Sequence, residues 1–142
     1  MGTFGKWVVY GTAIAFLGFG FAFYFWPGEL LAYVSIALDA GMSRTEIRAV
    51  YGGMNTGIGL AVLSLVWRGH VVPAAALSTA VLVPILAGRC LGLAFDGSAG
   101  PEIFKLMALE GAGALLNALV WALSPGAAPG AVADGLASDR RT

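Results

Sequence analysis

The chain has 142 residues, enough for one domain, and 58% of them are hydrophobic while only 11% are charged. A soluble domain has about 25% charged residues, so this composition predicts a membrane protein. The formal net charge is zero, which provides no positive field for nucleic acid. The single cysteine, Cys90, cannot form an intramolecular disulfide, and one histidine without a Cys/His cluster argues against a zinc site.

The first long apolar segment runs from Trp7 to Trp26 and contains no charged residue. Its length, roughly 20 residues, is enough to cross a bilayer core of roughly 30 Å as a helix. The segment is too long for the core of a signal peptide and has no Ala-x-Ala site at its end, directly before Pro27, so we interpret it as a retained membrane helix. The apolar stretch from Glu29 to Leu38 is too short to cross, which predicts an interfacial segment between the first two spans.

The second span is predicted over residues 45–67. Gly52, Gly53 and Gly57 lie in it, and the spacing from Gly53 to Gly57 is the small-xxx-small pattern that lets another helix approach closely. The short link Arg68-Gly69-His70 follows, with Gly69 placed to end the helix. A link of this length predicts that the second and third spans are antiparallel neighbours.

The third span is predicted over residues 72–95, with a kink at the interior Pro84. A turn at Asp96-Gly97-Ser98 and a proline at position 101 precede the fourth span, predicted over residues 102–123. Small residues that favour helix packing in these two spans are Gly88, Gly92 and Gly113. Residues 125–142 are rich in alanine, glycine and proline, which predicts a disordered tail.

Four spans with short links predict an all-α, antiparallel four-helix transmembrane bundle over residues 1–124, with both termini on one side. That side carries Lys6, Arg68, Arg140 and Arg141. Since basic residues concentrate on the cytoplasmic side of membrane proteins, we expect cytoplasmic termini. The opposite side would then be extracytoplasmic and net acidic.

This topology brings several polar residues to one membrane face. Arg89 and Glu110 are the most favoured partners, because they lie at similar depths on consecutive antiparallel helices. Arg48 either joins them or pairs with Asp96. The other residues of this predicted polar cluster are Asn55 and Asn117, deeper on the same helix faces, with Tyr51 and Trp121 as lining residues.

Three interpretations of the polar cluster stay open. The first is a structural ion pair that fixes helix register, in which removal of one partner costs about 3–5 kcal/mol. The second is a binding pocket in which two arginines against one glutamate suit a phosphate, carboxylate or quinone-type head group. The third is a proton-coupled transporter with Glu110 as the titrating group. No nucleophile–base pair, phosphate-binding loop or dinucleotide motif is present, so the sequence does not predict an enzyme.

The segments EIRAVYGG (residues 46–53) and AGRCLGLAFDG (residues 87–97), followed by Pro101 and Glu110, are similar to a bacterial family of small four-span membrane proteins. That family is known only as a domain of unknown function, and the similarity covers roughly residues 7–123. It implies a multi-pass protein of the bacterial inner membrane and supplies no activity. A looser similarity to DoxX-like four-helix membrane proteins, some of which are membrane subunits of redox systems, implies a quinone-linked accessory role. If the polar cluster is a pocket, its expected ligand is a lipid or quinone. The expected partners of the chain are the lipid bilayer and either other membrane subunits or a second copy in a homodimer.

Overall fold

The structure is a computed structural model that describes residues 2–33, 41–97 and 100–124. Its elements in chain order are α1 (Gly2–Phe25), α2 (Pro27–Tyr33), α3 (Gly41–Ile47), the π-helix η1 (Arg48–Gly53), α4 (Met54–Trp67), α5 (Val71–Asp96) and α6 (Pro101–Ala122). The described part of the chain contains no strand. The predicted tail, and residues 34–38 of the predicted interfacial segment, lie outside the described residues.

Four helical stretches are long and apolar enough to cross a membrane: Thr3–Phe25, Arg44–Trp67, Val71–Asp96 and Pro101–Ala122. The second of them joins the end of α3, η1 and α4 into one continuous rod. Large apolar side chains face outward, as lipid contact requires; Trp67 is 81% exposed and Phe95 is 82% exposed. The predicted all-α bundle with four membrane-spanning helices is confirmed, and the protein is an integral membrane protein.

The ends of these helices follow from local sequence. Gly69 adopts a positive φ of 86°, and its N–H donates to the Val66 carbonyl, while the His70 N–H donates to the Leu65 carbonyl. This Schellman arrangement ends α4 at the predicted glycine and reverses the chain into α5. Pro101 opens α6 as predicted, because its fixed φ suits the first helical position and its missing N–H has no intrahelical partner there.

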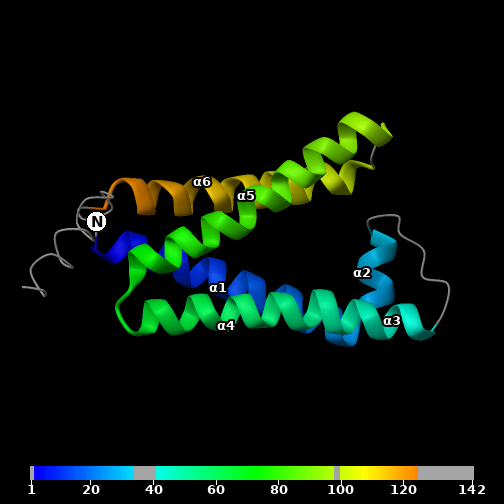
Figure 1. Cartoon of the computed structure of the whole chain (residues 1–142), viewed down its shortest axis with the longest axis horizontal. Helices are drawn as coiled ribbons and strands as arrows, with labels where there is room; N and C mark the ends of the chain where they lie inside the picture. The colour runs from blue at the N-terminus through cyan, green and yellow to red at the C-terminus, as the bar shows by residue number, and fades with distance from the viewer. Residues whose placement is uncertain (1, 34–40, 98–99, 125–142) are drawn as a thin grey trace, which may run out of the picture.

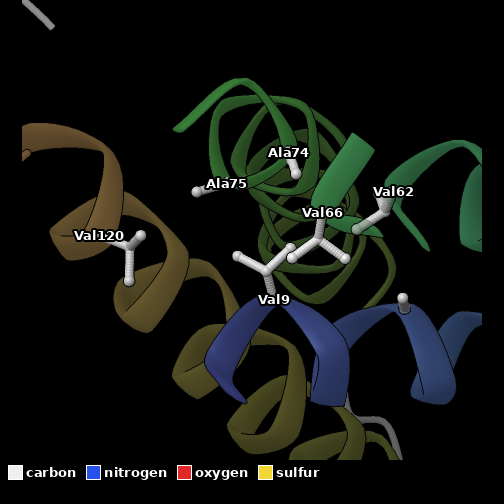
Figure 2. Close-up of a cluster of buried hydrophobic side chains, with 7 residues drawn as sticks. Val9, Val62, Val66, Ala74, Ala75 and Val120 are labelled. Carbon is white, nitrogen blue, oxygen red and sulfur yellow. The ribbon is translucent and has the colours of Figure 1, made fainter. Parts of the chain in front are cut away.

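The hydrophobic core lies at the end of the molecule that contains the start of α1. It consists of small side chains from all four long helices, namely Val9, Ala13, Val62, Val66, Ala74, Ala75 and Val120 (Figure 2). Small side chains allow the helices to approach closely, and close approach is what drives packing in lipid. A second, smaller layer of Phe16, Leu82 and Ala114 ends this core.

Beyond that layer the bundle separates into two helical hairpins. One consists of α1 with η1 and α4, and the other of α5 with α6; in Figure 1, α5 runs obliquely away from α4. No residue is buried in the described parts of segments 83–97 and 100–113, which are the last half of α5 and the first half of α6. We call this end of the molecule the splayed half. Helix α5 passes through Pro84 without interruption, and its buried residues all precede that proline.

The α1–α4 hairpin depends on a close approach at Gly20. A Cβ atom at this position would lie 2.8 Å from the Thr56 backbone nitrogen and 3.0 Å from the Gly52 carbonyl oxygen. Backbone atoms cannot move aside cheaply, so only glycine fits. Gly52 in turn contacts the Tyr24 ring, where an added Cβ would lie 3.0 Å from the ring carbons.

The glycines that pack are therefore only partly those expected from spacing. Gly52 contacts α1 as predicted, but Gly57 has open space around it and Gly53 is only loosely covered. The predicted Gly53–Gly57 pair is not the contact surface, because the face turned toward α1 carries Gly52, Thr56 and Gly59 at regular helical spacing. Helix α1 instead meets Gly52 and Gly59, seven residues apart, with Leu17 close to Gly59.

The three glycines of the last two spans also differ from one another. A Cβ on Gly113 would lie 3.2 Å from a Leu82 methyl carbon, so this glycine brings α6 close to α5 as expected. Gly88 has nothing within 4 Å, and Gly92 would meet only Asp96 of its own helix. Both lie in the splayed half, where no second helix covers them.

Candidate functional site

The central polar feature is an ion pair between Arg89 of α5 and Glu110 of α6. Arg89 Nε donates to Glu110 Oε2 at 2.7 Å, and Arg89 Nη2 donates to Glu110 Oε1 at 2.8 Å. This is the bidentate geometry in which a guanidinium matches a carboxylate best. The sequence analysis favoured these two residues as partners, and antiparallel packing of α5 on α6 brings them together.

The pair lies below the helix ends but within the splayed half. Arg89 is seven residues before the end of α5, roughly 10 Å along the axis, and Glu110 is nine residues after the start of α6, roughly 14 Å. The side chains remain 29% and 16% exposed. Both charged groups are therefore partly enclosed, and α1 and η1 do not seal them.

Tyr51 approaches the pair from the other hairpin. It belongs to η1, its phenol interacts electrostatically with the Arg89 guanidinium, and its side chain is 43% exposed. Its ring packs on Phe23 of α1, with centroids 5.3 Å apart and planes tilted by 34°. Tyr51 is thus the aromatic residue of the other hairpin that interacts with the Arg89–Glu110 pair.

The π-helix η1 orients Tyr51. Its six residues interrupt the α-helical ladder, and such segments occur frequently at functional sites. The Tyr51 carbonyl accepts a hydrogen bond from Asn55 Nδ2 at 2.7 Å, which satisfies a backbone group in the irregular region. Close packing of Gly52 on Tyr24 then holds η1 against α1.

Arg48 does not join the pair. Its Nε donates to the Tyr24 carbonyl at 2.9 Å, and within the described residues it forms no ion pair, either with Glu110 or with Asp96. Both predicted arrangements fail for one physical reason: η1, which contains Arg48, packs on α1, while α5 runs away from α4 (Figure 1). Asp96 is exposed at the end of α5.

The two asparagines also have different surroundings from those predicted. Asn55 bonds within its own helix. Asn117 is fully buried and bridges helices as expected, with Nδ2 donating to Thr12 Oγ1 and to the Gly113 carbonyl, each at 2.8 Å. Its place in the fold, however, is the core, seven residues beyond Glu110. Trp121 lies farther still toward the end of α6, so neither residue lines the Arg89–Glu110 pair.

Three contributors were missed by sequence reasoning. Phe23 is one of several phenylalanines in α1, and no pattern separates it from the lipid-facing ones. Tyr24 acts through its backbone carbonyl, which no side-chain motif can indicate. Thr12 has a detectable signal in retrospect, because it is a polar residue within the apolar span and its hydroxyl donates to the Val8 carbonyl.

Comparison with known proteins gives a family without a known activity. Residues 4–123 match the domain of unknown function DUF4345. The chain belongs to this family. No curated protein matches the sequence, and no solved structure matches it. The DUF4345 match spans all four long helices, so the Arg89–Glu110 pair lies inside the family domain.

Proposed function

We propose that this protein is a binding or accessory subunit of the bacterial inner membrane, and that the Arg89–Glu110 pair with Tyr51 holds the polar head of a lipid or quinone. The observation that carries the proposal is a bidentate ion pair placed in the splayed half. A pair enclosed in the packed core could not be reached by a ligand, whereas a pair outside that core keeps its remaining donors and acceptors accessible. Here the buried core ends before the pair begins.

The spare hydrogen-bonding capacity of the two side chains supports binding. Arg89 uses two of its five N–H groups on Glu110, and each carboxylate oxygen accepts one bond from Arg89. A head group between the hairpins would find remaining donors on the guanidinium, remaining acceptors on the carboxylate and a hydroxyl on Tyr51. The apolar tail of that lipid or quinone would lie against the membrane-facing apolar sides of α5 and α6.

A replacement that removes both charges at once tests this proposal. We expect the Arg89→Met/Glu110→Gln variant to fold and to lose a lipid or quinone that co-purifies with the parent chain, measured by mass spectrometry of extracts from the purified protein. The matched control is Glu102→Gln/Lys105→Met, which removes the exposed pair of α6. Equal retention of the same molecule by both variants would contradict a binding role.

The competing function is structural, and the bidentate geometry itself favours it. In that case the pair serves only to fix the register of α5 on α6, and the double variant changes neither the co-purified molecules nor the activity of any partner. A transporter role for Glu110 has less support, because both carboxylate oxygens accept hydrogen bonds from Arg89. Proton-driven uptake in liposomes that persists in Glu110→Gln would exclude that role.

A further inference from the structure

The charge at the site points to a particular class of ligand. Sequence reasoning placed two arginines against one glutamate, which suits an anion. The structure removes Arg48 from this group and leaves one guanidinium bonded to one carboxylate. The Arg89–Glu110 pair is therefore neutral overall, and Glu110 offsets much of the attraction that Arg89 exerts on an incoming anion.

The surrounding charges do not restore a positive field. Among the described residues at this end of the molecule, the four basic side chains are outnumbered by five carboxylates. The basic residues are Arg44, Arg48, Arg89 and Lys105, and the acidic residues are Glu29, Glu46, Asp96, Glu102 and Glu110. Lys105 is already paired with Glu102. No excess of positive charge is left to hold a phosphate.

The position of the Arg89–Glu110 pair along its helices also disfavours a charged ligand. The two charged groups lie roughly 10–14 Å along their helices from the helix ends, and charge is costly to bring into the hydrocarbon region. A phosphate head group would leave the water interface to reach Arg89. An uncharged ring would not meet this cost, and the Phe23–Tyr51 pair offers it an aromatic surface.

We infer that the ligand of this site has an uncharged, planar head group whose oxygen atoms are carbonyl acceptors in one redox form and hydroxyl donors in the other, as in a quinone and its quinol. This inference rests on the proposed function. A carbonyl oxygen accepts from the free N–H groups of Arg89 and from the Tyr51 hydroxyl, and a hydroxyl donates to Glu110. The site therefore binds the oxidised and the reduced form of such a ring.

Native mass spectrometry of the full chain in uncharged detergent tests the inference directly. The probes are a benzoquinone with a ten-carbon tail and the anionic lipid phosphatidylglycerol, offered together in equal amounts. We expect one quinone bound per chain in preference to the lipid. Arg89→Met/Glu110→Gln weakens quinone binding by about tenfold or more, whereas Glu102→Gln/Lys105→Met leaves it unchanged.

A second variant keeps the test decisive if the double variant does not fold. Tyr51→Phe retains the ring that packs on Phe23 and removes only the hydroxyl, so we expect quinone binding to weaken by about three- to tenfold. Unchanged quinone affinity in Tyr51→Phe overturns the inference.

The outcomes separate the inference from the proposed function. If phosphatidylglycerol binds in preference and is lost in the double variant, the uncharged-ligand inference fails while the binding function stands. If neither probe binds but another co-purified molecule is lost in the double variant, the uncharged-ligand inference again fails and the binding function again stands. If the double variant folds and keeps its ligand, or if the pair binds only a second copy of the chain, both fail.

Discussion

Arg89 and Glu110 each carry a charge that is tolerable only because the other is present. Removal of one partner leaves an uncompensated charge among apolar helices, whereas removal of both leaves none. The energetic signature of this pair is therefore a large coupling between two replacements, not a large effect of both together.

We expect Arg89→Met and Glu110→Gln each to lower the free energy of unfolding by about 2–4 kcal/mol, and the double variant to be destabilised by less than the sum. Reversible unfolding in mixed detergent micelles measures these values. The same cycle on Glu102 and Lys105, an exposed pair at 3.5 Å, should give a coupling below about 0.5 kcal/mol. Additive effects at Arg89 and Glu110 would show that the two charges do not depend on each other.

A second prediction at the scale of a single side chain concerns Asn117. Its amide joins α6 to α1 through Thr12 in the fully buried core, so Asn117→Ala should destabilise the protein by about 1–2 kcal/mol. Asn55→Ala is the comparison, since Asn55 bonds only to its own helix, and we expect a cost below about 0.5 kcal/mol. The same unfolding assay applies, and equal costs would contradict the assigned bridging role.

Among the elements, α1 approaches η1 and α4 most closely at a single residue, Gly20. Gly20 of α1 lies against the backbone of Gly52 and Thr56, where no side chain can be accommodated without separating the helices. The stability of this hairpin is consequently sensitive to a single methyl group at position 20.

Gly20→Ala should therefore destabilise the protein by about 2 kcal/mol or more, despite the better helix propensity of alanine. Gly18→Ala on the same helix and Gly57→Ala on α4 are controls, because an added Cβ at either position meets nothing within 4 Å. These two variants should be neutral or more stable by up to about 1 kcal/mol. Thermal unfolding of the three proteins in one detergent provides the comparison, and a stable Gly20→Ala variant would refute the close approach.

Sequence reasoning recovered the elements better than their contacts. Apolar length indicated the four spans, and Gly69 and Pro101 marked a helix end and a helix start, because these signals are local. The wrong expectations concerned which helix faces meet, because apolar length and end signals do not say how helices are rotated and inclined against one another. Gly57 and Asn55 consequently lie away from their predicted neighbours. No pattern in residues 46–53 predicts the π-helix η1 either.

For the molecule as a whole, the difference between its two ends decides where function can reside. The Arg89–Glu110 pair was predictable, because consecutive antiparallel helices bring these depths together. Arg48 was not, because its position depends on how one hairpin is inclined to the other. A prediction from spans alone assumes that the four helices stay packed together along their whole length. In this bundle the shared buried core ends at Phe16, Leu82 and Ala114.

The orientation of the whole molecule in the membrane makes a further prediction. In a Cys90→Ser background, we expect Gly100→Cys to react with a membrane-impermeant maleimide in intact bacterial cells, and His70→Cys to react only after permeabilisation. Both positions are exposed and lie at opposite ends of α5 and α6. Cytoplasmic termini require this pattern, and the reverse pattern would place the splayed half in the cytoplasm.

The ion pair between the last two long helices also constrains how the protein enters the membrane. An arginine at the centre of a lone helix opposes insertion by about 2.5–3.5 kcal/mol, and Arg89, seven residues before the end of α5, opposes it by a smaller amount. The α1–α4 hairpin contains no such charge in its interior contact, which is made by Gly20, Gly52 and Thr56. Helix α5, in contrast, is synthesised before α6, so Arg89 reaches the membrane without its partner Glu110. We therefore expect α5 to remain at the insertion machinery until α6 has been made, and the two helices to enter the bilayer together.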